Sequence, residues 1–210
     1  MAICSPDDVR AIAMLPTDEV TDAQLNVFID HAQKIIIGQI SSHIVEEKIN
    51  TIDSYRENTI DGSNTSFFTK NSWSDYYTFD EDGDGVLSTT DMNAWLYESS
   101  DDTRTEATLA TINENGNFTL DSAPESSVDM TISYRIAPVS LTDPRLKVAC
   151  EFLAAAFAFT RIRADEFDNI SLGSLRVSNK RKTFDYYHER YLKIIDEIKR
   201  LPRKSHRGKL

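Results

Sequence analysis

Apolar residues recur at helical spacing over the first fifty positions of the chain. Ser5, which is followed by a proline, predicts the start of a short helix that stops at Pro16. Thr21 and Gln24 form a capping box that predicts the start of a second helix. In this helix an apolar residue follows every three or four positions, namely Leu25, Phe28, Ala32, Ile36, Ile40 and Ile44. The stripe predicts a long amphipathic helix that ends near Lys48.

The pattern changes between residues 51 and 139. Short runs of β-branched and aromatic residues, broken by Asp, Asn, Gly and Ser, predict strands in this part of the chain. Residues 106–112 and 117–120 flank an Asn-Gly pair and are expected to form a hairpin, because Asn-Gly supplies the positive φ angles of a tight turn. Residues 128–136 alternate between apolar and polar and predict a further strand.

Helical spacing returns at Asp143, a cap followed by a first-turn proline, and continues through Thr160. Alanines at positions 154, 155, 156 and 158 allow a neighbouring backbone to approach this helix closely, either inside the subunit or across a subunit interface. Residues 161–182 have a Gly-Ser centre and predict a loop. A last helix is expected from Thr183 until Pro202 ends it, with apolar residues at alternating spacings of three and four.

These patterns predict an α+β fold, a helical bundle of about four helices with a β-rich insertion between the second and third main helices. Residues 1–50 and 140–201 are expected to form the helical core, residues 51–139 the β-rich insertion, and residues 202–210 a basic flexible tail. A chain of 210 residues can bury one core and a small satellite domain.

Charge is distributed unevenly along the chain. Residues 1–142 carry a net charge of −18 and residues 143–210 a net charge of +7, which together give the −11 of the whole chain. The acidic part is interpreted as a solvated surface. Cations concentrate at the end of the chain, in the set Lys199, Arg200, Arg203, Lys204, His206, Arg207 and Lys209. This basic tail is either a docking segment or a solubilising one.

Several classes of protein do not fit the sequence. The first residues have neither a basic nor an apolar segment of the kind a secretory signal requires, and the longest apolar stretch is shorter than a membrane span, so no membrane association is predicted. Cys4 and Cys150 are far apart in the sequence and have no Cys or His companions. Their spacing excludes a disulfide framework and a zinc site, and both are expected to be packing thiols.

The sharpest local motif is the acidic run at residues 80–91, DEDGDGVLSTTD. It fits the pattern of an EF-hand-type calcium loop, in which side chains at alternate positions point at the ion and a glycine at the sixth position permits the turn. The predicted ligands are Asp80, Asp82, Asp84, the carbonyl of Val86, Ser88 through a water molecule, and Asp91. Calcium is the expected ion, with magnesium as a competitor because Asp91 is shorter than the usual Glu. A cation-free acidic turn is the alternative interpretation.

No catalytic constellation is found in the sequence. The four histidines share no motif with a nucleophile, and phosphate-binding, serine-hydrolase and metalloprotease motifs do not occur. We therefore expect a protein that is not an enzyme. The aromatic residues Trp73, Tyr76, Tyr77, Trp95 and Tyr97 suggest either a sugar-binding platform or part of a core.

The order of these segments resembles the head-tail connector proteins of long-tailed viruses, also called adaptor or head-completion proteins. The resemblance extends over residues 5–201 as a pattern. It rests on a first helix that ends in proline and on five sequence segments, TDAQL at 21–25, VDMTISYR at 128–135, DPRL at 143–146, LAAA at 153–156 and LGSLRV at 172–177, followed by a tyrosine-rich helix.

The resemblance implies a structural protein of the virion, made in the host cytoplasm and located at the head-tail junction. Such subunits form a homo-oligomeric ring, usually of twelve copies, between the portal protein and a tail-side neck or tail-terminator protein, and DNA passes through the ring. Docking of the basic tail on the portal, through Arg203, Lys204, Arg207 and Lys209, is a further expectation. The main alternative is a calcium-dependent protein- or glycan-binding module.

Overall fold

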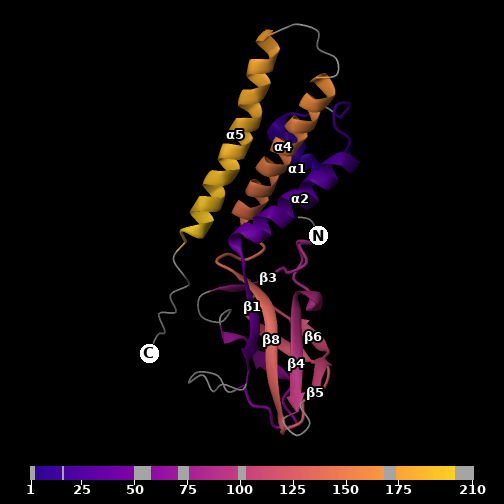
Figure 1. The fold of residues 1–210 in the computed structure, drawn as a ribbon, viewed down its shortest axis with the longest axis vertical. Coiled ribbons are helices and arrows are strands. Elements are labelled where there is room, and N and C mark those ends of the chain that lie inside the picture. The colour runs from indigo at the N-terminus through magenta and orange to yellow at the C-terminus, as the bar shows by residue number, and fades with distance from the viewer. Residues whose placement is uncertain are drawn as a thin grey trace. The chain divides into compact units, whose positions relative to one another are not determined.

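The computed structural model describes residues 3–15, 17–49, 58–70, 76–98, 103–167 and 174–201. The described residues form four α-helices and two antiparallel sheets, a mixed α+β fold (Figure 1). The chain divides into two compact units. We call them the helical unit, which comprises Met1–Ile40, Gly83–Gly85 and Thr142–Arg200, and the β unit, which comprises Ser41–Asp82, Val86–Leu141 and Leu201–Leu210.

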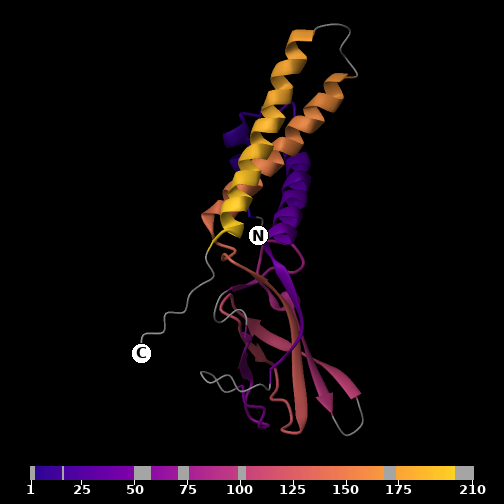
Figure 2. The ribbon, with the colours of Figure 1, turned by 60° about the vertical axis from the view of Figure 1, so that its left-hand side comes forward.

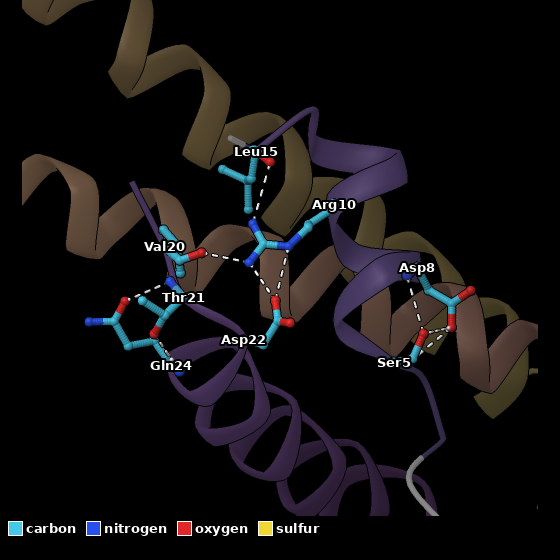
Figure 3. A network of polar contacts seen from close by, with 8 residues as sticks. All are labelled: Ser5, Asp8, Arg10, Leu15, Val20, Thr21, Asp22 and Gln24. Carbon is cyan, nitrogen blue, oxygen red and sulfur yellow. Dashed lines mark hydrogen bonds and ion pairs between the residues drawn. The ribbon is translucent and has the colours of Figure 1, made fainter. Parts of the chain in front are cut away.

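The helical unit begins with α1 (Pro6–Ala13) and α2 (Asp22–Ile40), and both predicted helix starts are confirmed. The hydroxyl of Ser5 accepts the amide of Asp8 at 3.3 Å, and the carboxylate of Asp8 accepts the amide of Ser5 at 2.9 Å. Thr21 and Gln24 make the same reciprocal pair ahead of α2 (Figure 3). Each cap satisfies amides that the first helical turn leaves without partners.

Arg10 connects α1 to the segment that leads into α2. Its guanidinium donates to the carbonyl of Val20 at 2.7 Å and to the carboxylate of Asp22 at 2.6 Å, and it reaches the carbonyl of Leu15 at 3.5 Å (Figure 3). These bonds satisfy carbonyls of the α1–α2 connection. The connection is therefore held by one side chain that the sequence pattern did not single out.

The other two helices of the unit are α4 (Pro144–Phe167) and α5 (Ser174–Lys199), which lie side by side in both ribbon views (Figures 1 and 2). The alanines at positions 154, 155, 156 and 158 of α4 have no exposed surface, and α4 packs against α1, α2 and α5. The small side chains therefore allow close packing inside the subunit. Phe159 of α4 stacks on Tyr187 of α5 with ring centroids 5.4 Å apart.

The β unit contains two antiparallel sheets. In the first, β1 (Ser42–Lys48), β8 (Val128–Ala137), β4 (Met92–Glu98) and β5 (Thr103–Ala107) follow one another, and β3 (Tyr77–Phe79) also pairs with β8. In the second, β7 (Asn117–Leu120) lies between β2 (Ser66–Phe68) and β6 (Leu109–Ile112). The two sheets share a buried core that includes Phe67, Met92, Phe118, Met130, Ile132 and Tyr134.

The sequence predicted two parts of the β unit correctly. The hairpin is β6 followed by β7, and Gly116 in its turn has φ of +76°. Residues 106 and 107, which were expected in the same hairpin, belong to β5. The predicted strand at 128–136 is β8.

The predicted end of the second helix is wrong. The second helix ends at Ile40 and not near Lys48, because residues 42–48 form β1 and pair with β8. Ile44 continues the helical spacing of α2, but its side chain packs against the β core. The boundary between the helical and β units accordingly lies at Ile40 and Ser41, about ten residues before the predicted one.

The expected loop at residues 161–182 is also largely helical. α4 extends to Phe167 and α5 starts at Ser174, where Leu, Arg and Lys are frequent and favour the helix. No helix in the described part of the chain has both the length and the apolar character that crossing a bilayer requires. The basic tail from residue 202 onward lies outside the described residues, as do Pro16 and Trp73.

Candidate metal centre

The acidic run follows β3 directly and ends where β4 begins. β3 pairs with β8 so that Phe79 faces Arg135 in the ladder, and Phe79 is fully buried. Asp80, the next residue, has no exposed surface. The strand therefore fixes the start of the loop and places the first carboxylate inside the protein.

The carboxylates of Asp80, Asp82 and Asp84 come together in this loop. One oxygen from each lies within 4.8 Å of the others, and Asp82 and Asp84 are exposed while Asp80 is buried. Gly83 lies between Asp82 and Asp84 and has a φ angle of +82°. Gly85 follows Asp84 and has a φ angle of +80°. Because L side chains rarely adopt this conformation, glycine at both positions allows the tight path that gathers the three carboxylates.

The three carboxylates suit a hard cation. Like charges at this separation repel one another, and calcium or magnesium would offset the repulsion while accepting oxygen ligands. Calcium takes six to eight oxygen atoms in flexible geometry, so about three or more further ligands would come from carbonyls, hydroxyls or water. The three carboxylates could thus hold a metal ion.

Asp91, the predicted twelfth-position ligand, has a different set of contacts. Its Oδ1 accepts the amides of Glu81 at 2.7 Å and Asp82 at 3.4 Å, and its Oδ2 accepts the amide of Ser88 at 2.6 Å. The side chain is 1% exposed, and burial raises its pKa against the effect of these amide bonds. Asp91 lies outside the three-carboxylate cluster and holds the two ends of the loop together.

Ser88 caps the short 3-10 helix η1 (Thr89–Asp91), where its hydroxyl accepts the amide of Thr90 at 3.3 Å. The Thr90 hydroxyl in turn donates to Asp82 at 3.3 Å. Ser88 therefore connects to the acidic cluster through Thr90, a residue that the sequence motif did not single out. Val86 follows the second glycine and is partly exposed. Coordination through Val86, Ser88 and Asp91 stays a prediction.

Glu81 lies between Asp80 and Asp82 in the sequence, but its carboxylate pairs with Arg135 and is not part of the cluster of three carboxylates. Its carboxylate accepts two hydrogen bonds from the guanidinium of Arg135, at 2.9 and 3.2 Å, and Arg135 also donates to the Ser41 hydroxyl at 3.1 Å. His43 Nε2 lies 4.0 Å from the same carboxylate. This pairing neutralises one of the acidic residues and ties the loop to β8.

Within the helical unit, Gly83 packs against α2. The Gln33 amide donates to the carbonyl of Gly83 at 3.5 Å, and its Oε1 accepts the amide of Ile3 at 2.5 Å. A Cβ atom at position 83 would lie 3.0 Å from the side chain of Lys34. Glycine is thus needed at position 83 for two reasons, its positive φ and the close approach of α2.

The aromatic candidates have separate environments. Tyr76 packs on the β core, whereas Trp95 and Tyr97 are half-buried on β4. The guanidinium of Arg104 lies 4.2 Å from the ring centroid of Trp95 and 5.7 Å from that of Tyr97. Arg104 also pairs with Glu46 at 2.9 Å. The two rings therefore belong to a cation-π arrangement on the sheet surface.

Two comparisons with known proteins complete the description of the site. Neither a scan against models of protein families nor a search of curated proteins finds a match for this chain.

Proposed function

We propose that the protein is a structural subunit of a head-tail connector of a tailed virus. It forms a homo-oligomeric ring, of twelve copies by resemblance, between the portal and a tail-side neck or tail-terminator protein, and DNA passes through the ring. The single observation that carries the proposal is the order of elements. α1 and α2 precede the inserted β unit, and α4 and α5 return to complete the same helical unit.

This order of elements supports the proposal because the resemblance to head-tail connector proteins implies a helical bundle, and the four helices form one helical unit. The helices of the helical unit come from two separate chain segments, Met1–Ile40 and Thr142–Arg200, which are joined by close packing of α4 against α1, α2 and α5. The β unit is therefore an addition to a helical body, and it lengthens the chain relative to small connector proteins. Its own core and its own two sheets are consistent with a separate task in the assembly.

A ring also needs apolar surface for its subunit contacts. Val27 and Ile35 on α2 are 51% and 40% exposed, and both share one face of the helix with His31 at a spacing of four residues. Beside this face, Phe28 and Phe157 contribute to a pocket of about 300 Å³ between α2 and α4. We assign the face of Val27, His31 and Ile35 to the contact between neighbouring subunits.

The cation in this account has a structural role. Asp80 continues from β3, and Asp91 leads into β4, so an ion held by the three carboxylates stabilises the connection between two strands of one sheet. Calcium is the proposed ion and magnesium its competitor. The basic tail, with Arg203, Lys204, Arg207 and Lys209, is proposed to dock on the portal.

Native mass spectrometry of the full chain with the portal protein of the same genome tests this function. The proposal predicts complexes that contain one portal ring and many copies of the chain. Val27→Asp and Ile35→Asp should reduce the number of bound copies, whereas Asn26→Asp, which adds the same charge at another exposed position of α2, should not. A chain that stays monomeric with and without the portal would contradict the proposal.

A calcium-dependent binding module is the second candidate, because the acidic cluster and the half-exposed Trp95 and Tyr97 both lie outside the helices. In that case the β unit would recognise a protein or a glycan and the helices would support it. Retention on a glycan or peptide array that requires calcium and is lost with a chelator, by a chain that stays monomeric, would favour this second function.

A further inference from the structure

The two cysteines of the chain meet in the helical unit. Cys4 and Cys150 are separated by 146 residues, yet their Sγ atoms are 2.9 Å apart. Both thiols are reduced and buried, at 3% and 0% exposure. The expectation of packing thiols is confirmed, but the contact between them was not predicted from their spacing.

Contacts on both sides hold Cys4 against α4. Before it, the amide of Ile3 donates to Gln33 of α2, and after it, Ser5 begins the capping box of α1. The carboxylate of Asp8 forms an ion pair with Lys147 at 2.8 Å. Lys147 lies one turn before Cys150 on the same side of α4. The thiol pair is thus positioned by α1, α2 and α4 together.

We propose that Cys4 and Cys150 are a site of reversible oxidation that forms an intramolecular disulfide. A disulfide needs sulfur atoms about 2.0 Å apart, so the bond requires a movement of about 1 Å from the observed arrangement. The inference does not depend on the proposed function. It concerns only the helical unit, and it predicts a covalent link between the N-terminal segment and α4.

A low-molecular-weight disulfide such as oxidised glutathione is the oxidant. The thiolate of one cysteine attacks it, forms a mixed disulfide and releases one glutathione thiolate. The second cysteine then attacks the protein sulfur of the mixed disulfide and expels the second glutathione. Two protein thiols are oxidised and one small disulfide is reduced, and the two protons of the protein thiols pass through solvent to the two released glutathione thiolates, which become thiols.

The environment of the thiols sets when the reaction begins. The hydrogen bond with Cys4 and burial raise the pKa of the Cys150 thiol. Since the thiolate is the nucleophile, the closed thiol pair reacts slowly, and attack starts when the N-terminal segment opens. After oxidation the bond closes a loop of 146 residues that contains both sheets of the β unit, and such a bond restricts the unfolded chain.

The test uses the purified full chain in glutathione buffers of graded redox ratio. Samples are quenched with N-ethylmaleimide in denaturant, and intact mass is measured. The expected product is a monomer that is 2 Da lighter, takes up no maleimide and carries no glutathione. Its formation should require on the order of 100-fold less oxidised glutathione than in chain unfolded in guanidinium, because the folded protein holds the two sulfurs together.

The variants Cys4→Ser and Cys150→Ser complete the experiment. Each should lose the −2 Da product and keep one reactive thiol, and the oxidised parent should melt roughly 5–10 °C above the reduced parent. Retention of two maleimide-reactive thiols, mixed glutathione adducts or linked dimers as the only products would overturn the proposal. So would an equal redox midpoint for the folded and unfolded chain.

Discussion

The Oδ2 atom of Asp91 accepts the backbone amide of Ser88 at 2.6 Å, and its Oδ1 atom accepts the amide of Glu81 at 2.7 Å. This carboxylate joins the end of the acidic loop to its start through backbone groups. These hydrogen bonds therefore hold the two ends of the loop together without a bound ion. Asp91 and the three clustered carboxylates have different tasks, and single substitutions can separate them.

Asp91→Asn should lower the free energy of unfolding by about 1–3 kcal/mol, because an amide nitrogen would replace one of the two accepting oxygens and face a backbone N–H donor. Asp84→Asn, at an exposed position of the cluster, should leave the metal-free stability within about 0.5 kcal/mol of the parent. Urea unfolding in the presence of a chelator measures both. An equal decrease in the free energy of unfolding in the two variants would show that the hydrogen bonds of Asp91 do not stabilise the loop.

Calcium should stabilise the full chain. At a concentration 100 times its dissociation constant, an ion that binds only the folded state adds about 2.7 kcal/mol, which raises the melting temperature by roughly 5–10 °C. Thermal unfolding with calcium, with magnesium and with chelator measures the effect. The shift should be lost in a variant that combines Asp80→Asn with Asp82→Asn.

Glu125→Gln is the matched control for the calcium effect, because it removes one negative charge from an exposed position outside the loop. This variant should keep the full shift. Identical melting curves with calcium and with chelator, together with the absence of bound metal by elemental analysis, would leave the acidic run as a cation-free turn.

Asp8 should titrate at an unusually low pH. Hydrogen bonds from Lys147 and Ser5 lower the pKa of this carboxyl to about 2 from 3.8. A lowered pKa in the folded state means that the stabilising contribution is fully present above the unfolded value and is lost as the pH falls from about 4 to about 2. A carbon-detected NMR titration should therefore give a midpoint near 2 for Asp8.

Lys147→Ala should move the Asp8 midpoint upward toward 3.8, since Lys147 is the largest cause of the shift. Lys34→Ala removes a cation from the separate pair with Asp30 and should leave the Asp8 midpoint unchanged. If the Asp8 midpoint were the same in the parent and in the Lys147 variant, the ion pair would not hold in solution.

The features that the sequence predicted correctly are local ones. Ser5 and Asp8, or Thr21 and Gln24, lie three residues apart, so each side chain reaches the backbone amide of the other residue as soon as the helix forms. The Asn-Gly turn of the β6–β7 hairpin is local in the same sense. Such interactions depend on neighbouring residues and can be inferred from spacing alone.

The features that the sequence missed depend on distant partners. Ile44 keeps the helical spacing of α2, but β8 pairs with its segment from about ninety residues away. Arg135 binds Glu81 although the two residues are 54 positions apart, and Cys150 contacts Cys4 although 146 positions separate them. In the candidate site, the spacing of acidic residues indicated the three clustered carboxylates, whereas the amide contacts of Asp91 followed from the path of the loop.

Removal of the basic tail should weaken portal binding without unfolding the protein. A chain that ends at Pro202 lacks Arg203, Lys204, Arg207 and Lys209, the candidate portal-binding residues. In a pull-down on portal rings without DNA, the truncated chain should bind less than the full chain and show the same melting temperature. A control chain with these four residues changed to Gln separates loss of charge from loss of length. Unchanged portal binding by the truncated chain would leave contact with DNA or simple solvation as the role of the tail.

The central claim is that this chain forms part of the neck of a virus particle. The most direct test is immunogold electron microscopy of purified particles of the virus whose genome encodes the chain, with an antibody raised against the β unit and quantitative mass spectrometry of the same particles. If the chain forms part of the neck, the label should lie at one place, between head and tail, and the copy number per particle should match one ring. Particles that lack the protein, or label distributed over the head or at the far end of the tail, would contradict it.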